Sequence, residues 1–399
     1  MNKLLKTPKE HAKAMKRLEE LLMLDPADTS AEGEEIELLG LLIDNYEKEK
    51  FPIENPSPTE AIRFRMEQMD LKQKDLIPMI GSRSRVSEIL SGKRPLTLPM
   101  ARELHRKLKI PADLLLGEEH GDLPDEIDTA CYPVQEMQKL GWFRKWKGKR
   151  WADVKDHAEE MLQELFGGAP PSELLAYNRT GFKEGAEPDE AALAGWRHHV
   201  LREAVGKKLP QYKKENFSPA ALNELAKKSS LATGPRHAIA FLEDRGVAVV
   251  IASHLTKTYL DGAALLGKKG RPVIGLTLRH NRLDNFWFTL FHELGHVLRH
   301  LSESDDNFFD DTESGDNSTK EAEANQFALN QLIPEWEWQS IRVVTRAPEI
   351  RKEAKRLGIH PSIIAGRLRK DTRDYTRHPQ LVGQGEVRKA LGYEAKWPV

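Results

Sequence analysis

The chain has 399 residues, of which 39% are hydrophobic and 31% charged, and its formal net charge at pH 7 is -1. This length allows two or three domains with cores of their own, and no apolar run is long enough to span a membrane. The first residues lack the apolar core of a signal peptide, and a single cysteine, Cys131, excludes an internal disulfide. We therefore expect a soluble protein of the reducing cytoplasm.

Residues 1–56 are predicted to form an acidic helical arm. Residues 1–57 carry 8 Lys or Arg against 13 Asp or Glu, so the nearly neutral total hides a local excess of negative charge. An acidic helical surface favours a basic protein partner. We expect this arm to dock such a partner.

Residues 57–119 are predicted to form a helix-turn-helix domain. One short helix ends at Gly81, and a second helix begins after it and stops at Gly92. The second helix of such a pair can enter the major groove. Residues 58–110 carry 12 Lys or Arg against 6 Asp or Glu, which favours DNA as the partner. The candidate base-reading residues are Arg83, Ser84, Arg85, Ser87 and Glu88, and the candidate phosphate contacts are Lys93 and Arg94.

The stretch from residue 35 to residue 115 resembles the HigA family of antitoxins, which are themselves lambda-repressor-like. Residues 35–39, 44–47, 56–62 and 110–115 carry the resemblance, and residues 81–94 are its densest part. It implies a homodimer that represses its own operon at double-stranded operator DNA. It also implies a small basic toxin as partner, such as a ribonuclease of the HigB kind. The alternative is a helical domain that has lost DNA binding and serves only to dock proteins.

Residues 120–229 are predicted to form a linker and a helical cap. Trp142, Trp146 and Trp151 alternate here with lysines and arginines. Such interleaving can stack on single-stranded nucleic acid. We favour the other interpretation, in which the tryptophans pack against the domain that follows.

Three short strands are expected over residues 246–252, 262–266 and 272–278. A turn at residues 267–270 would join the last two strands into a hairpin. A small sheet beside a catalytic helix can hold an extended peptide by edge pairing. A purely structural hairpin is an equal alternative.

The segment His292-Glu293-Leu294-Gly295-His296 is the most informative in the chain. Because positions i and i+4 share one face of a helix, His292 and His296 can bind one metal ion. Glu293 could take a proton from a metal-bound water, which completes the zinc metallopeptidase arrangement. An Asp or Asn at residues 284–285 could cap this helix.

A catalytic zinc usually takes a third protein ligand. His300 lies roughly 12 Å along the helix axis from His292, too far to share the ion. The next helical run contains Glu321 and Glu323, which are roughly 200° apart around a helix, so that only one of them can face the metal.

Residues 288–296, together with 321–328 and 332–334, resemble the ImmA/IrrE metallopeptidase family. In that family's pattern the glutamate directly before Ala-Asn is the metal ligand. The resemblance therefore implies Glu323 as the third zinc ligand, and Glu321 is the alternative.

The same resemblance implies specific cleavage of a regulatory protein, either a repressor or this chain itself within residues 117–131. The peptidase domain would span residues 230–375 and include a helical pair near its end, and residues 376–399 would form a tail. An alternative from another class is a non-enzymatic repressor-antitoxin whose carboxy-terminal domain is a sensor or binding module. The fold class expected is mainly α with a small β-sheet (α+β), with an N-terminal lambda-repressor-like domain and a C-terminal zincin-like domain.

Two further features bear on the predicted metal site. Tyr259 and His254 are candidates to stabilise the oxyanion, because polar donors must face the metal from the opposite wall. Residues 303–316 include seven acidic residues and are expected to form either a solvated loop or a lid over the cleft.

Overall fold

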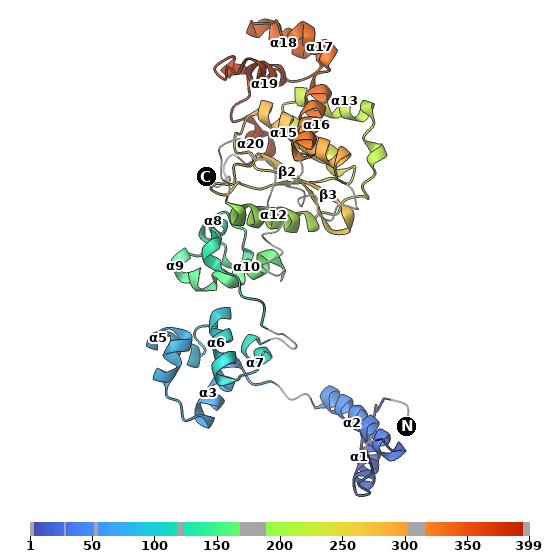
Figure 1. Cartoon of the computed structure of the whole chain (residues 1–399), viewed down its shortest axis with the longest axis vertical. Helices are drawn as coiled ribbons and strands as arrows, with labels where there is room; N and C mark the ends of the chain where they lie inside the picture. Colours follow the sequence, from blue (N-terminus) through green and yellow to red (C-terminus); the bar gives the residue numbers. More distant parts are fainter. Residues whose placement is uncertain are drawn as a thin grey trace. The chain divides into compact units, whose positions relative to one another are not determined.

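The computed structural model describes residues 4–27, 29–51, 55–117, 123–167, 189–301 and 316–393 (Figure 1). The chain divides into two compact units, Met1–Leu123 and Pro124–Val399. The described residues are mainly helical and contain one small three-stranded sheet, which confirms the predicted fold class. None of the helices described is both long and apolar enough to cross a membrane.

The first unit begins with two helices that pack against each other, α1 (Pro8–Leu22) and α2 (Ala31–Lys50). Helix α1 begins where it does because the Thr7 side chain accepts a hydrogen bond from the Glu10 N–H, and the Glu10 carboxylate accepts one from the Thr7 N–H. An ion pair of 2.7 Å between Arg17 and Glu35 links the two helices. Their shared core is small and consists of Leu5, Ala14, Leu21, Leu39, Ile43 and Tyr46.

The rest of the first unit is a bundle of short helices with its own apolar core. The first helix of the predicted pair is a 3-10 turn followed by a single α-turn, and it ends at Gly81 as expected. The second helix is capped by Ser82, whose side chain accepts from the Arg85 N–H. The elements are α3 (Pro58–Gln68), η1 (Gln73–Leu76), α4 (Ile77–Ile80), α5 (Arg83–Leu90), α6 (Leu98–Leu108) and α7 (Ala112–Leu116).

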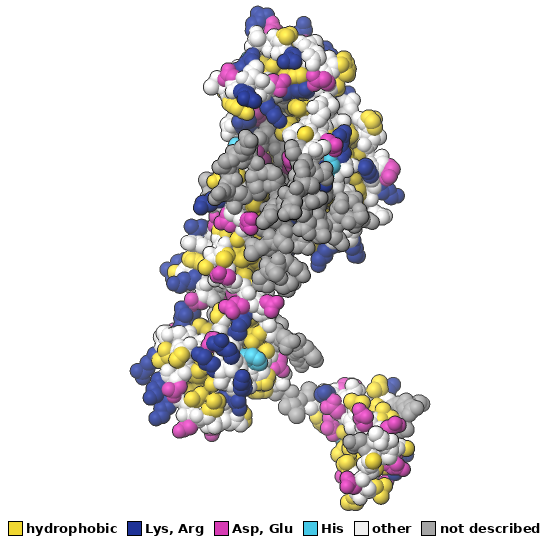
Figure 2. Space-filling view, viewed as in Figure 1, with side chains coloured by type: hydrophobic (Ala, Val, Ile, Leu, Met, Phe, Trp, Pro, Cys, Tyr) yellow, Lys and Arg dark blue, Asp and Glu magenta, His cyan; other side chains and the backbone are white. Residues whose placement is uncertain are grey.

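Helix α5 has one buried face and one exposed face. Val86 and Ile89 are buried in the core of the bundle, while Arg83, Ser84 and Ser87 on the other face are exposed. Figure 2 shows Lys and Arg side chains gathered over the surface of this bundle. A short helix is thus presented to solvent within a basic surface.

The second unit begins with a helical layer that packs on the sheet. Trp142 and Trp146 are buried in one cluster with strand residues, and Trp142 stacks on His199 with ring centroids 4.2 Å apart. This confirms packing, not nucleic-acid stacking, as the role of these tryptophans. The layer comprises η2 (Thr129–Cys131), α8 (Val134–Lys139), η3 (Arg144–Trp146), α9 (Trp151–Val154), η4 (Lys155–His157), α10 (Ala158–Phe166) and α12 (Glu190–Val205).

The sheet consists of β1 (Ala248–Ile251), β2 (Gly262–Leu266) and β3 (Pro272–Leu276) in the order β1-β3-β2. Strand β3 is parallel to β1 and antiparallel to β2, so the predicted hairpin is confirmed, with η7 (Lys268–Gly270) in its connection. Strand β2 is therefore an edge strand of this sheet.

The two faces of the sheet enter different cores, because successive side chains of a strand point to opposite sides. In β3, Val273 packs with the helical layer that contains α12, and Ile274 packs with α15 (Leu283–Arg299). Every residue of β3 is buried. A strand buried on both faces reads as a continuous apolar run, which is why the sequence revealed it.

Further helices surround α15 on its side of the sheet (Figure 1). The predicted helical pair near the end is present and is joined at Gly358. The elements are η5 (Lys214–Asn216), α13 (Pro219–Lys227), η6 (Lys228–Ser230), α14 (Gly234–Glu243), α16 (Asp316–Leu332), α17 (Glu335–Ile341), α18 (Ala347–Leu357), α19 (Pro361–Thr372), η8 (Pro379–Leu381) and α20 (Glu386–Leu391).

The expected cap of α15 was wrong. The helix begins at Leu283 with Arg282 at the cap position and no side-chain cap bond, so Asp284 already lies in the first turn. The Asp284 carboxylate instead accepts two hydrogen bonds of 2.9 Å from the Arg282 guanidinium. This carboxylate still compensates the positive end of the helix dipole.

Candidate metal centre

Helix α15 is held in place by its apolar side. Trp287, Leu290, Phe291 and Leu294 are fully buried in the core beneath the sheet. Such close packing leaves the helix little freedom to rotate. The remaining face, which carries the two histidines of the predicted motif, is therefore fixed in direction.

Helix α16 crosses α15 very closely at Gly295. A side-chain Cβ at this position would lie 3.0 Å from the Phe327 ring and 3.3 Å from the Ala324 Cα. The glycine in the middle of the motif thus allows the two helices to approach. This approach brings a carboxylate of α16 within reach of the histidines.

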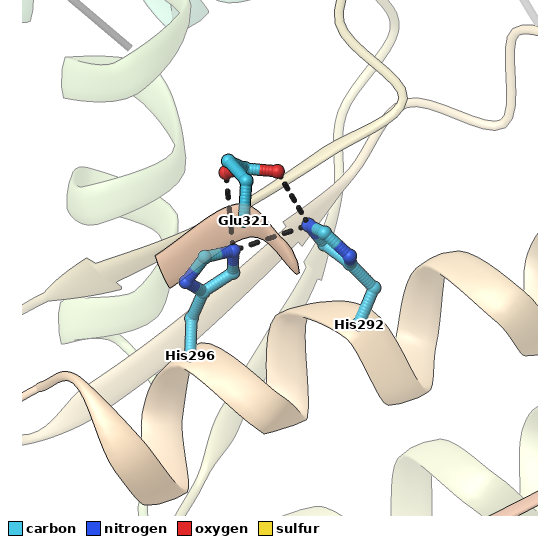
Figure 3. Close-up of side chains that lie close together, drawn as sticks. All are labelled: His292, His296 and Glu321. Atoms are coloured by element: carbon cyan, nitrogen blue, oxygen red, sulfur yellow. Dashed lines mark hydrogen bonds and ion pairs between the residues drawn. The ribbon is translucent and has the colours of Figure 1, made fainter. Parts of the chain in front are cut away.

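Three side chains converge at the crossing, as Figure 3 shows. The Nε2 atoms of His292 and His296 are 3.1 Å apart, and each lies 3.3 Å from a different carboxylate oxygen of Glu321. A tetrahedral zinc with bonds of about 2.0–2.1 Å would place its ligand atoms about 3.3 Å from one another. Two imidazole nitrogens and a carboxylate oxygen are also ligands that zinc prefers, so these three residues fit the ion in spacing and in chemistry.

The charges within this cluster support one another. Burial opposes ionisation of Glu321, but hydrogen bonds from both histidines lower the pKa of this carboxyl to about 2. Burial likewise opposes protonation of His292, yet Glu321 and the neighbouring Glu293 raise the pKa of this imidazole above its usual value. The concentration of negative charge that raises this pKa is the kind of environment that attracts a cation.

Glu293 is 6% exposed and lies directly beside the two histidines. Burial raises the pKa of the Glu293 carboxyl, an effect that the histidines and a hydrogen bond from the Ala264 N–H only partly offset. A carboxylate with a raised pKa is a better proton acceptor, as a general base requires. The Glu293 Oε1 would lie 3.1 Å from a Cβ at Gly262, so the bare backbone of β2 borders it closely.

The structure brings Glu321, and not Glu323, to the two histidines, so the geometry favours the alternative third ligand over the one that the family pattern implied. The Glu323 carboxylate lies 3.0 Å from Nε2 of His300, the residue at the end of α15. As expected from helix geometry, the two glutamates do not face the same point. The alternative residue, Glu321, is the one that meets His292 and His296.

A cleft of about 880 Å³ contains the cluster and is bordered by β2, α15, α16 and α19. Of the two candidates for oxyanion contacts, Tyr259 lines this cleft and His254 is not among the lining residues. Burial lowers the pKa of His254, and its Nδ1 has no hydrogen-bond partner within the described parts of the chain. Arg282 and Lys370, which sequence analysis did not single out, also line the cleft.

The candidate DNA contacts all lie on or just after α5. Arg83, Ser84, Ser87 and Lys93 are exposed, whereas Arg85 is half-buried. Glu88 accepts from the Arg94 Nε at 2.7 Å and from the Ser84 hydroxyl at 3.3 Å. The hydrogen bond with Arg94 lowers the pKa of the Glu88 carboxyl.

Two expectations fall partly or wholly outside the described residues. The proposed acidic lid, residues 303–316, lies outside them except for Asp316, whose backbone begins α16. The predicted self-cleavage segment, residues 117–131, includes 118–122, which are also outside.

Comparison with known proteins supports the peptidase part of the prediction. Residues 242–365 match the model of a peptidase family described as the IrrE N-terminal-like domain. Neither the curated proteins nor the solved structures gave a significant match. The matched stretch contains the sheet, α15, the described part of α16 and the whole His292, His296 and Glu321 cluster.

Proposed function

We propose that this chain is an antitoxin-type transcriptional regulator of a toxin–antitoxin operon that carries a zinc-dependent endopeptidase. The peptidase would cleave a regulatory protein, either a repressor or the chain itself. The observation that carries this proposal is a buried glutamate, Glu293, beside a set of three metal ligands whose spacing fits zinc.

The chain's own residues divide the chemistry among them. His292, His296 and Glu321 would hold the zinc ion, which when bound acidifies a water and polarises the scissile carbonyl. Glu293 accepts the proton of the attacking water and passes it to the departing amine. Because burial favours its neutral form, Glu293 can hold this proton between the two transfers.

The edge of the sheet is suited to hold a peptide. Strand β2 borders the cleft through Gly262, Ala263 and Ala264. An extended substrate could pair with the backbone of this edge strand and so lie beside Glu293. Tyr259, in the same cleft, would donate its hydroxyl hydrogen to the oxyanion.

The regulatory part of the proposal is supported by the first unit. Helix α5 presents exposed polar and basic residues, which suits the major groove of an operator. On α2, Leu38 and Leu41 are exposed between Glu34, Glu37 and Asp44. An apolar stripe flanked by acidic residues suits a small basic toxin, and the regulator would act as a homodimer on a palindromic operator.

The first experiment is to measure zinc per chain by plasma mass spectrometry after loading and desalting. About one zinc is expected in the wild type, none in Glu321→Ala, and close to the wild-type content in Glu323→Ala. Retention of zinc by Glu321→Ala and its loss from Glu323→Ala would restore the family-based assignment. A wild type without zinc would favour the alternative, a non-enzymatic repressor-antitoxin.

A further inference from the structure

Behind the candidate metal site, a chain of hydrogen bonds leads from His296 through His300 to Glu323. The Nδ1 atom of His296 is 3.0 Å from Nδ1 of His300, and the Nε2 atom of His300 is 3.0 Å from a carboxylate oxygen of Glu323. His300 is buried, and Glu323 lies at the surface. This series of hydrogen bonds therefore starts at the candidate metal site and ends at solvent.

The protons in this series of hydrogen bonds can be arranged in only one order once Nε2 of His296 binds a metal. A neutral imidazole that binds through Nε2 carries its proton on Nδ1. That N–H must donate to Nδ1 of His300, so the proton of His300 resides on its Nε2. The Nε2–H then donates to Glu323, which as a carboxylate can only accept.

We infer that His300 and Glu323 are positioning residues, which fix the tautomer and the ring direction of the ligand His296. Outer partners of this kind raise the basicity of a metal-bound imidazole and typically contribute 10–100-fold to metal affinity. This inference rests on the proposed metal site. It gives Glu323 an indirect function, exerted on the ion through His300 and His296, in place of the role of direct ligand that the family pattern implied.

The fold explains why both glutamates of α16 are used. Glu321 meets His292 and His296, while Glu323 meets His300 one turn further along α15. Two residues of one helix that point in different directions can therefore contact successive turns of its neighbour. One carboxylate would hold the ion, and the other would hold a ligand in place.

Substitutions of His300 test this order of donors and acceptors. Glutamine at this position offers an oxygen to the His296 N–H and an NH₂ group to Glu323, so His300→Gln can restore the series of hydrogen bonds. His300→Leu cannot. We expect zinc affinity, measured by competition with a chromophoric chelator, to fall 10–100-fold in His300→Leu and to recover most of this loss in His300→Gln.

A substitution at the surface tests the same inference without the risk that a change at a buried residue causes the protein to misfold. Glu323→Ala should also lower zinc affinity, although less than His300→Leu, and should leave the melting temperature of the zinc-free protein unchanged. The matched control is Gln326→Ala, since Gln326 is exposed on the same helix and bonds only to Asn330 among the contacts described. Long-range ¹H–¹⁵N spectra of the zinc-loaded protein should show His296 protonated at Nδ1 and His300 at Nε2.

The outcomes separate the two hypotheses. If the wild type binds zinc and His300→Leu and Glu323→Ala bind it equally tightly, the positioning role is refuted and the metal site stands. Equal losses in His300→Leu and His300→Gln would also refute it, because the hydrogen-bond acceptor and donor that glutamine restores would then make no difference to zinc affinity. If the wild type binds no zinc, the metal site and the positioning role both fail.

Discussion

The two units of this chain expose their functional candidates to solvent in opposite ways. In the second unit, Glu293 and His296 are less than a tenth exposed and are fixed by the packing of two helices. In the first unit, Arg83 and Ser87 stand on the open face of α5. Catalysis depends on groups whose pKa and direction the protein controls, whereas recognition of a duplex depends on groups that can reach it. Function in the two units should consequently respond to different substitutions.

The largest difference between the effects of one substitution on the two units is expected for Glu293→Gln. Loss of the general base should lower cleavage by at least about 10²–10⁴-fold, while zinc content and DNA binding remain. Cleavage of a proteome-derived peptide library by the zinc-loaded protein, followed by mass spectrometry, measures the first quantity. An equal loss of DNA binding in the same variant would show that the units do not act independently.

Acidification should destabilise the second unit through two histidines of α12. Burial lowers the pKa of His198 to about 4 and of His199 to about 3, whereas both would titrate near 6.5 in the unfolded chain. Below pH 6.5 the unfolded state therefore binds protons that the folded state does not. The free energy of unfolding should be highest above pH 6.5 and fall by about 2 kcal/mol per histidine between pH 7 and pH 5.

All eight tryptophans lie in the second unit, so tryptophan fluorescence during denaturant unfolding follows this unit alone. His199→Phe keeps a ring on Trp142 and should remove about half of the pH dependence. His237→Phe, at an exposed histidine, is the control and should leave it unchanged. A pH dependence that persists in full in His199→Phe would contradict the prediction.

In the first unit, Arg85→Ala should weaken operator binding by about 1–3 kcal/mol if its guanidinium reads a base. Lys93→Ala, at a candidate phosphate contact, should instead weaken binding to all sequences alike and reduce the salt dependence by about one counterion. Fluorescence anisotropy with the DNA preceding the gene and with scrambled DNA distinguishes these effects. Neither variant should alter zinc content. Unchanged binding in both would leave α5 as a docking element only.

The smallest effect is expected at the start of α3. The Ser57 side chain accepts from the Glu60 N–H, and Glu60 accepts from the Ser57 N–H at 2.8 Å. Ser57→Ala should lower the free energy of unfolding of the first unit by about 1 kcal/mol. Hydrogen exchange should report this change in the first unit and none in the second, and a change in both would argue for coupling between them.

Much of the second unit could be predicted because its signals are local. Two histidines four residues apart, an apolar strand and a glycine-bounded hairpin each appear within a few residues of sequence. The choice between Glu321 and Glu323 could not be made this way. Periodicity shows that the two face different directions, but which direction meets α15 depends on how the helices cross.

The same limit explains the other differences. The cap expected at residues 284–285 was wrong because Arg282, just outside the helix, engages Asp284 and leaves it within the first turn. The role of His300 was missed because distance along the helix excluded it as a ligand, and an indirect contact through His296 leaves no signal in spacing. In each case the missing information was a contact between residues of different elements or turns, which spacing along the sequence does not reveal.

The absence of a side chain at Gly295 lets α15 and α16 approach closely, and the distance between these helices would decide which size of metal ion the candidate site fits. Helix α15 supplies two of the three candidate ligands and α16 the third, so the distance between the two helices would set how far apart the candidate ligand atoms lie. Alanine at this position would press on Ala324 and Phe327 and move these ligand atoms apart by a few tenths of an ångström. The preference of the site among divalent ions should then move from zinc toward the larger cadmium. Gly295, the smallest residue of the motif, would in this way set the size of ion that the site accepts.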